Sequence, residues 1–394
     1  MVDAVRPAVP LSWSPMRIHC PRQSAGEQRV AITPDVVATL VNRGHTVTIE
    51  PGAGDGAGFD DATYREAGAD IADTDSGADL VATVGDLDVL GRSDARSVLG
   101  LLEPFRRPDR MRELAATGTI VFAFEAVPRT TRAQTVDALS SQATTAGYQA
   151  VLAAAAASDR LFPMLTTAAG TIRPAKVVVL GAGVAGLQAI ATARRLGAVV
   201  SGFDVRDAAA EQVESLGARF ITLGSAEPAD ASDSGGYAKE LADDAQQQII
   251  DGLAPHLADA DVVITTAAVP GRDAPKLLDD RTLAMMRSGA VIVDLAASTG
   301  GNTTRTEAAT TVDVDGVTII GDSLLARHVA ADSSRMYARN VSAFVDLLAD
   351  DDGAFAPDWS DDIVDGSCIA RDGRLVHPRL IEAPAEPTPP EETT

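Results

Sequence analysis

The chain has 394 residues, of which 45% are hydrophobic, so it is long enough for two or three domains with ordinary cores. Its formal net charge is −23, with 56 acidic and 33 basic residues. A surface of this kind repels nucleic acid and is typical of adaptation to high salt. The two cysteines and five histidines lack the spacing of a disulfide framework or a metal site, which predicts a reducing, cytoplasmic location. No uninterrupted apolar run approaches the roughly 20 residues that a membrane-spanning helix needs.

The first 140 residues are expected to hold a parallel sheet flanked by helices. Residues 1–15 lack the apolar core of a secretory signal, and their three prolines predict a disordered extension. Strands are expected in short apolar runs, at 17–20, 46–49, 80–84, 98–102 and 119–124. Helical patterns alternate with these runs, at 33–43, 61–68 and 110–116. This half carries no glycine fingerprint, so it is predicted to be a companion domain and not a nucleotide site.

Residues 131–158 contain no proline and a single glycine, which predicts one long helix, or two nearly continuous ones, leading into a second domain. That domain is expected to add helices at 208–216 and 237–257 and strands at 261–265, 290–295 and 317–320. The chain then returns to the first domain through a helix at 336–348 and a hairpin at 366–376 around Asp372-Gly373. The predicted domains are therefore 16–140 with 328–380, and 141–327, followed by a disordered tail at 381–394.

The segment from Lys176 to Arg206 has the order of a dinucleotide-binding βαβ unit. A β-branched run predicts a strand at 176–180, and the glycines of a GxGxxG turn follow at Gly181, Gly183 and Gly186. A helix over about 185–196 would direct its free N–H groups at a pyrophosphate, and a strand at 199–203 would lead to an acidic residue. The fold class is therefore α/β, with two doubly wound, Rossmann-like parallel-sheet domains, the second inserted in the first and joined to it by long helices.

Asp204 is the residue that chooses between nicotinamide cofactors. It lies 204 − 181 = 23 positions after the first glycine, where a carboxylate accepts hydrogen bonds from an adenosine ribose. A 2′-phosphate a few Å away would meet a repulsion on the order of 1–4 kcal/mol, which favours NAD(H) over NADP(H). An arginine at position 206 is able to receive a 2′-phosphate, but after Asp204 we interpret Arg206 as a solvated charge beside the adenine.

Several separate blocks of sequence then resemble one family. They are RTTRAQTVDALSSQATTAGYQAV from Arg129, RPAKVVVLGAGVAGLQAIATARRLGA from Arg173, SGGYAKE from Ser234, VVITTAAVPGRDAPKLL from Val262, GAVIVDLAASTGGN from Gly289, and the closing GSCIARDGRLVHP. From residue 16 to about 378 the chain resembles the NAD(H)-binding domain, domain I of the alpha subunit, of proton-translocating (Re/Si-specific) NAD(P) transhydrogenases, in the alanine dehydrogenase/transhydrogenase superfamily.

The resemblance implies hydride transfer directly between two nicotinamides, from NADH bound by this chain to NADP+ bound by a partner domain. The NADP(H)-binding domain and the proton channel would lie on other, membrane-spanning subunits, so the chain is expected to be a separate alpha-1 type subunit. It would be peripheral to the cytoplasmic membrane through those partners and, as in the family, a homodimer.

The resemblance also assigns roles to individual residues. An Arg-Gln-Asp loop that orients the nicotinamide matches Arg129, Gln134, Asp137 and Ser140, where residues three apart would crowd one edge of a helix start. The alternative interpretation of these residues is a helix cap with solvated polar neighbours.

The other matched residues contact the cofactor in the family. Besides the glycines and Asp204, they are Val184, Val205, Arg206, Gly236, Tyr237 and Ala268. Tyr237 would close over the nucleotide as part of an acidic mobile loop at 224–236, and Ala268 would lie against the adenine.

Two other functions remain open at this stage. A self-contained dehydrogenase of the alanine dehydrogenase type needs a lysine and a histidine in its first domain, because it moves a proton as well as a hydride. No lysine precedes Lys176, and the strands VATVG and LGLLE carry no histidine. The remaining alternative is an NAD-sensing module without catalytic activity.

Overall fold

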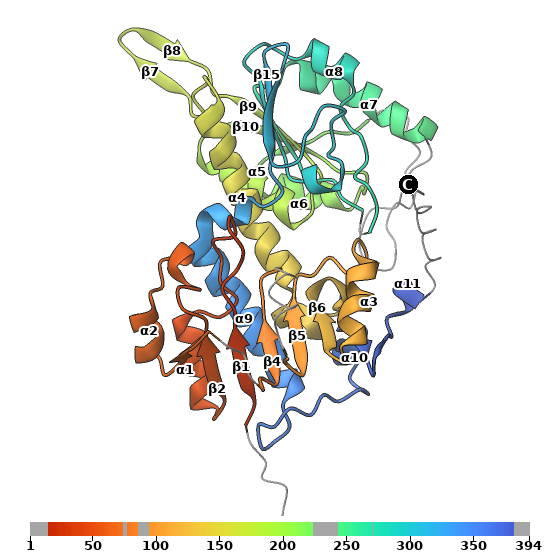
Figure 1. Ribbon diagram of the computed structural model, residues 1–394. Helices are drawn as coiled ribbons and strands as arrows, with labels where there is room; N and C mark the ends of the chain where they lie inside the picture. Colours follow the sequence, from red (N-terminus) through yellow and green to blue (C-terminus); the bar gives the residue numbers. More distant parts are fainter. Residues whose placement is uncertain (1–14, 74–76, 86–93, 224–242, 270, 382–394) are drawn as a thin grey trace, which may run out of the picture. The chain divides into compact units, whose positions relative to one another are not determined.

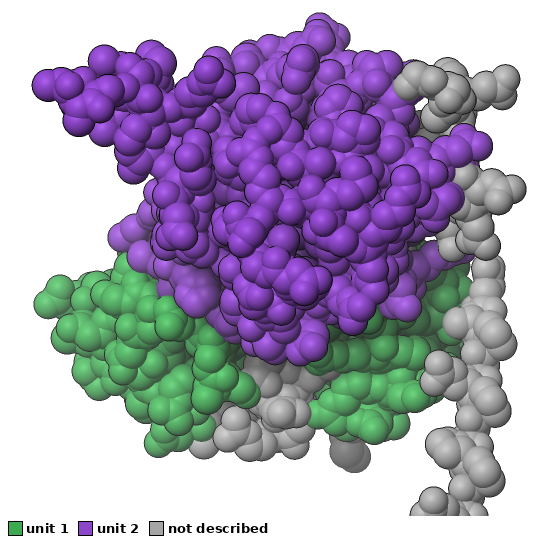
Figure 2. All heavy atoms as spheres, turned by 90° about the horizontal axis from the view of Figure 1, so that it is seen from above, with its two compact units in different colours: residues 1–136, 337–394 green, residues 137–336 purple. Residues whose placement is uncertain are grey.

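The computed structural model describes residues 15–73, 77–85, 94–223, 243–269 and 271–381. Both chain ends and the acidic loop with Gly236 and Tyr237 lie outside these residues, so the predictions made for them are not addressed. The chain forms two compact units, residues 1–136 with 337–394 (unit 1) and residues 137–336 (unit 2), which are coloured separately in Figure 2. The second unit is thus inserted in the sequence of the first.

Unit 1 is built on an eight-stranded mixed sheet (Figure 1). Its strands are β1 (Arg17–Cys20), β2 (Thr46–Ile49), β3 (Asp70–Ile71), β4 (Leu80–Ala82), β5 (Ser97–Gly100), β6 (Ile120–Ala123), β16 (Cys368–Arg371) and β17 (Arg374–Leu375). The six parallel strands follow the order β3-β2-β1-β4-β5-β6, which is the order of a doubly wound Rossmann sheet. The prediction of a purely parallel sheet is wrong at one edge, because β16 runs antiparallel to β6.

Helices cover both faces of this sheet. They are α1 (Pro34–Asn42), α2 (Asp61–Glu66), α3 (Pro108–Ala116), η4 (Thr131–Val136), α10 (Asp362–Ser367), α11 (Pro378–Ile381) and the later part of α9 (Ala330–Leu348); short 3₁₀ turns are η1 (Asp55–Ala57) and η3 (Phe124–Ala126). Met111 and Leu114 of α3 share a core cluster with Val98 and Val121 of the sheet. Tyr337 and Phe344 of α9 pack edge-to-face against Phe124, which follows β6. These buried contacts hold α9 to the first sheet.

Unit 2 contains a seven-stranded sheet in the order β11-β10-β9-β12-β13-β15-β14. The strands are β9 (Lys176–Leu180), β10 (Val199–Phe203), β11 (Arg219–Phe220), β12 (Val262–Thr265), β13 (Val291–Asp294), β14 (Thr310–Val314) and β15 (Val317–Gly321). All but β14 are parallel, and their order is again that of a doubly wound Rossmann sheet. The strand order changes direction between β9 and β12, which is where such sheets bind ligands.

Alternate residues of these strands face two separate cores. Val177 and Val179 of β9 share one cluster with residues of α4 (Ala138–Ala157), α5 (Val184–Arg195) and α6 (Ala209–Ser215). Val178 and Leu180 share the other with residues of α7 (Asp243–Ala258) and α8 (Asp280–Met285). The period of two along a strand thus yields a sheet with a helical layer on each face. The short 3₁₀ turns η5 (Ala297–Thr299) and η6 (Leu325–Val329) complete the unit.

A short hairpin that the sequence did not predict extends from the body of unit 2 (Figure 1). Its strands are β7 (Leu165–Thr167) and β8 (Gly170–Ile172), and every residue of both is exposed. A two-stranded hairpin of this size is marginally stable in water unless something packs against it. It is therefore a candidate contact surface.

Candidate functional site

The glycine turn after β9 has the shape that a dinucleotide requires. Gly181 adopts φ +99°, which disfavours any other residue, and a Cβ on Gly186 would overlap the carbonyl oxygen of Gly181. A Cβ on Gly183, in contrast, would meet no protein atom within 4 Å. The protein itself therefore does not demand a glycine at position 183, whereas a close-lying ligand would. The residues present fit the pyrophosphate of a dinucleotide against the N-terminus of α5.

Asp204 lies directly after β10 and is 9% exposed. Its Oδ2 accepts the backbone N–H of Ala182 at 2.8 Å, which ties the acidic residue to the glycine turn. Burial alone would raise the pKa of Asp204, but the hydrogen bonds from the side chain and backbone of Arg206 and from Ala182 outweigh it and lower that pKa. The carboxylate is therefore ionised at neutral pH, as an acceptor of ribose hydroxyls must be.

Arg206 is not the solvated charge that we expected from the sequence. Its Nε lies 2.9 Å from Asp204 Oδ1 and its Nη2 lies 3.0 Å from Asp204 Oδ2, and its side chain is only 25% exposed. The hydrogen bond to Asp204 raises the pKa of the Arg206 guanidinium. The error arose because sequence separation alone does not show that an arginine two residues away folds back onto the carboxylate.

Thr266, which the sequence did not single out, holds the turn from the neighbouring strand. It follows β12, and its hydroxyl donates to the carbonyl oxygens of Gly181 and Leu180 at 3.1 and 3.4 Å. A Cβ on Gly181 would lie 2.5 Å from that hydroxyl oxygen. Thr266 therefore fixes the first glycine at the switch point of the sheet. Its only sequence signal is its place immediately after a strand that neighbours β9.

Asn302 fixes the loop that carries Ala268 and is also new. This buried side chain donates to the carbonyl oxygens of Ala267 and Pro275, each at 2.8 Å, and accepts the N–H of Ala267 at 3.1 Å. Its own N–H donates to Oδ2 of the buried Asp294 at 2.7 Å. Ala268 itself is exposed, Val184 is 41% exposed at the first residue of α5, and Val205 is half-buried. The residues expected to touch the cofactor in unit 2 thus follow β9, β10 and β12, at the carboxyl edge of the sheet.

The four residues expected to be catalytic divide between the two units. Arg129 and the η4 residue Gln134 are exposed in unit 1. In unit 2, Asp137 is the N-cap of α4 and accepts the N–H of Ser140 at 2.9 Å and the Ser140 hydroxyl at 2.5 Å. The capping alternative is therefore correct for Asp137 as a description of local structure, and a cap does not exclude a further role.

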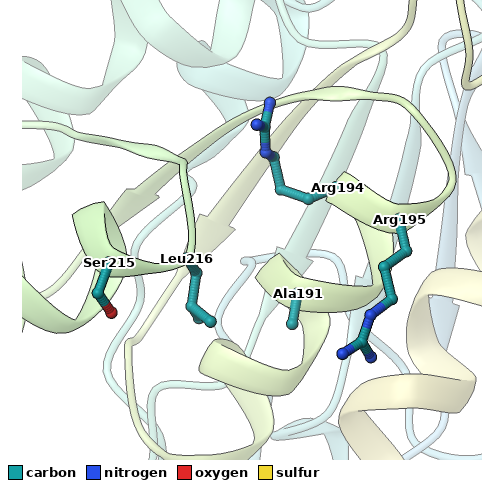
Figure 3. Close-up of a pocket in the computed structure, with 5 residues that line it drawn as sticks. All are labelled: Ala191, Arg194, Arg195, Ser215 and Leu216. Carbon is teal, nitrogen blue, oxygen red and sulfur yellow. The ribbon is translucent and has the colours of Figure 1, made fainter.

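A shallow hollow in unit 2 lies away from this edge (Figure 3). It is lined by Ala191, Arg194, Arg195, Ser215 and Leu216, at the carboxyl ends of α5 and α6. Because the glycine turn is at the other end of α5, this hollow is not the nucleotide site. Across the residues that the structure describes, no cluster of His, Cys, Asp and Glu side chains could hold a metal ion. No helix in these same ranges combines the length and apolar character needed to cross a membrane.

Comparison with known families decides the classification. The model of the alanine dehydrogenase/PNT N-terminal domain matches residues 20–146, and that of the C-terminal domain matches residues 150–378. The chain belongs to the alanine dehydrogenase/PNT family. These matches cover both Rossmann-like units.

Individual members of the alanine dehydrogenase/PNT family differ in their similarity to this chain. The first of the polypeptides that make up the NAD(P) transhydrogenase alpha subunit of Rhodospirillum rubrum is 41% identical over 379 residues, covering 93% of this chain and 99% of that protein. An alanine dehydrogenase of Halomonas elongata is 30% identical over 388 residues, covering 93% and 96%. The crystal structure of transhydrogenase from Sinorhizobium meliloti has a TM-score of 0.79 and 39% identity, covering 92% of this chain and 99% of that chain. Identity is thus higher with the transhydrogenase alpha subunit than with the alanine dehydrogenase.

Proposed function

We propose that unit 2 binds NAD(H) and that the chain is the NAD(H)-binding subunit of a proton-translocating NAD(P) transhydrogenase. The observation that carries the proposal is the junction of the Gly181–Gly186 turn with the buried Asp204 carboxylate at the switch point of the sheet. NAD(H), when bound, supplies or accepts a hydride. The first turn of α5 binds the pyrophosphate, Asp204 binds the adenosine ribose, and Ala268 lies beside the adenine.

Hydride transfer between two nicotinamides needs no general acid or base; it needs two rings held close together with water excluded. We therefore assign orienting roles to Arg129, Gln134, Asp137 and Ser140. Arg129 positions the nicotinamide amide or ribose, and Gln134 bridges the cofactor and the partner domain. The hydrogen bonds from Ser140 that fix Asp137 support a preorganised loop.

The proposal includes partners on other polypeptides. NADP(H) binds to a partner domain, and membrane-spanning subunits attach this chain to the cytoplasmic face of the membrane and carry the proton. The chain itself forms a homodimer. The exposed β7–β8 hairpin supports the dimer, because Met164 is 66% exposed while Leu165 and Ile172 are each 44% exposed.

Two experiments test these proposals. The chain is reconstituted with its membrane partners, and NADH-dependent reduction of an NADP+ analogue is measured; absence of reduction alongside intact NADH binding would favour an NAD-sensing module. Turnover of NAD+ with alanine, or of NADH with pyruvate and ammonia, by the chain alone would instead identify an alanine dehydrogenase. For the dimer, Met164→Asp combined with Ile172→Asp should halve the mass seen by sedimentation, and an unchanged dimer would exclude this interface.

A further inference from the structure

The salt bridge between Arg206 and Asp204 occupies the acceptor atoms that a ribose would use. Oδ1 of Asp204 accepts the backbone N–H of Arg206 at 2.9 Å and its Nε–H at 2.9 Å. Oδ2 accepts the N–H of Ala182 at 2.8 Å and the Nη2–H of Arg206 at 3.0 Å. A carboxylate offers about four lone-pair positions, so these four donors fill it.

Only two of these four donors are free to leave. The N–H groups of Ala182 and Arg206 belong to the backbone at the ends of β9 and β10, and moving them would disturb the strands. The guanidinium of Arg206 is at the end of a flexible side chain with a quarter of its surface in solvent. Ribose hydroxyls that donate to Asp204 can therefore enter only where the guanidinium has moved away.

We propose that Arg206 is a specificity-determining residue that competes with the adenosine ribose for Asp204. The inference rests on the proposed function, since it concerns the site at which NADH binds. In the empty site the guanidinium satisfies the buried carboxylate, and NADH binding replaces that ion pair by hydrogen bonds to the ribose. The same pair also commits the arginine to Asp204, so the site offers a 2′-phosphate no unneutralised cation.

The test compares NADH affinity of the wild type and the Arg206→Met variant by calorimetry. Methionine keeps an unbranched stem but removes the donors, so we expect NADH to bind about fivefold more tightly, equivalent to ~1 kcal/mol for one competing charged hydrogen-bond pair. Arg206→Lys, which cannot donate to both carboxylate oxygens in the same fork geometry, should give a smaller gain. Arg195→Met, on the surface of the same unit (Figure 3), is the matched control and should change nothing.

A second ligand separates competition from a general effect on the fold. An NADH analogue whose adenosine ribose lacks the 2′-hydroxyl makes fewer demands on Asp204, so the gain from Arg206→Met should shrink to less than half of that for NADH. An equal gain for both ligands, or an Arg206→Met variant that binds NADH no more tightly than the wild type, would overturn the inference. If the wild type does not bind NADH at all, the proposed function fails and this inference fails with it.

Discussion

At the scale of single residues, Asp204 both attracts a ribose and restrains Arg206. Replacing Asp204 by Asn removes the charge that repels a 2′-phosphate and releases the arginine to meet one. We expect weaker NADH binding and at least tenfold stronger NADPH binding, because the repulsion of about 1–4 kcal/mol is lost. Calorimetry with both cofactors measures the change. The gain for NADPH should disappear when Arg206→Met is added, and its persistence in the double variant would show that the phosphate is received elsewhere.

Glu125 predicts a pH dependence of stability in unit 1. Its Oε1 accepts the N–H of Glu103 at 2.7 Å, while its buried Oε2 has no hydrogen-bond partner among the described residues. Burial raises the pKa of Glu125 to about 7. Between the ordinary value of 4.5 and about 7 the folded state therefore binds more protons than the unfolded state, so stability falls as pH rises through this window.

Glu125→Gln should remove this loss, because an amide keeps an acceptor for the Glu103 N–H and cannot ionise. We expect equal stability of variant and wild type at pH 5 and a variant more stable by about 1–3 kcal/mol at pH 8. Urea unfolding at both pH values tests it, with the exposed Glu113→Gln as control. A stability difference that does not depend on pH would contradict the prediction.

At the scale of elements, buried strands are predictable from sequence and exposed edge strands are much less so. The run KVVVL and its parallel neighbours lie in two apolar cores, and each was predicted to within about two residues. The hairpin around Asp372-Gly373 was also found, because φ is positive at both turn residues. The same signal at Asp315-Gly316, which joins β14 to β15, went unused. In β7 and β8 no residue is buried, so no core imposes a pattern that could be detected.

The contact between α4 and α5 explains the only glycine of α4. A Cβ on Gly147 would overlap the carbonyl oxygen of Ala185, in the first turn of α5. Helix propensity alone would make Gly147→Ala stabilising by about 1 kcal/mol. Overlap with backbone costs typically 1–3 kcal/mol, so we expect a net loss of stability or none gained, together with weaker NADH binding because the turn at Gly183 is displaced.

Thermal unfolding and NADH calorimetry of Gly147→Ala measure both effects. Gln149→Ala, two residues further along the same helix, is the matched control and should raise stability slightly without changing NADH affinity. If Gly147→Ala were more stable than the wild type with normal affinity, the close approach of the two helices would not matter for the site.

At the scale of the whole molecule, the sequence predicts chemistry at the glycine turn better than chemistry that depends on distant segments. The spacing from Gly181 to Asp204 states the strand, turn, helix and acidic residue within one βαβ unit, and the structure joins both ends through the hydrogen bond from Ala182. Thr266 and Asn302 complete the same edge from other strands, and only the fold brings them there. The roles of Arg129 and Gln134 come from the family resemblance, because exposed polar side chains carry no packing signal of their own.

Gln134 tests the proposed transfer step with the complete set of subunits. A residue that holds a nicotinamide near its reaction partner acts chiefly in the transition state, so its loss should slow transfer more than it weakens NADH binding. We expect Gln134→Asn to leave NADH affinity within a few-fold and to slow the single-turnover hydride step about 10²-fold, the sensitivity of near-attack geometry to a shift of ~1 Å. Stopped-flow measurement with the NADP(H)-binding partner separates the two quantities, and Gln149→Asn, an amide elsewhere on α4, is the control. A hydride step unchanged in Gln134→Asn, with NADH binding intact, would leave Gln134 as an exposed polar residue of η4 and would withdraw the orienting role from the Arg129–Ser140 segment.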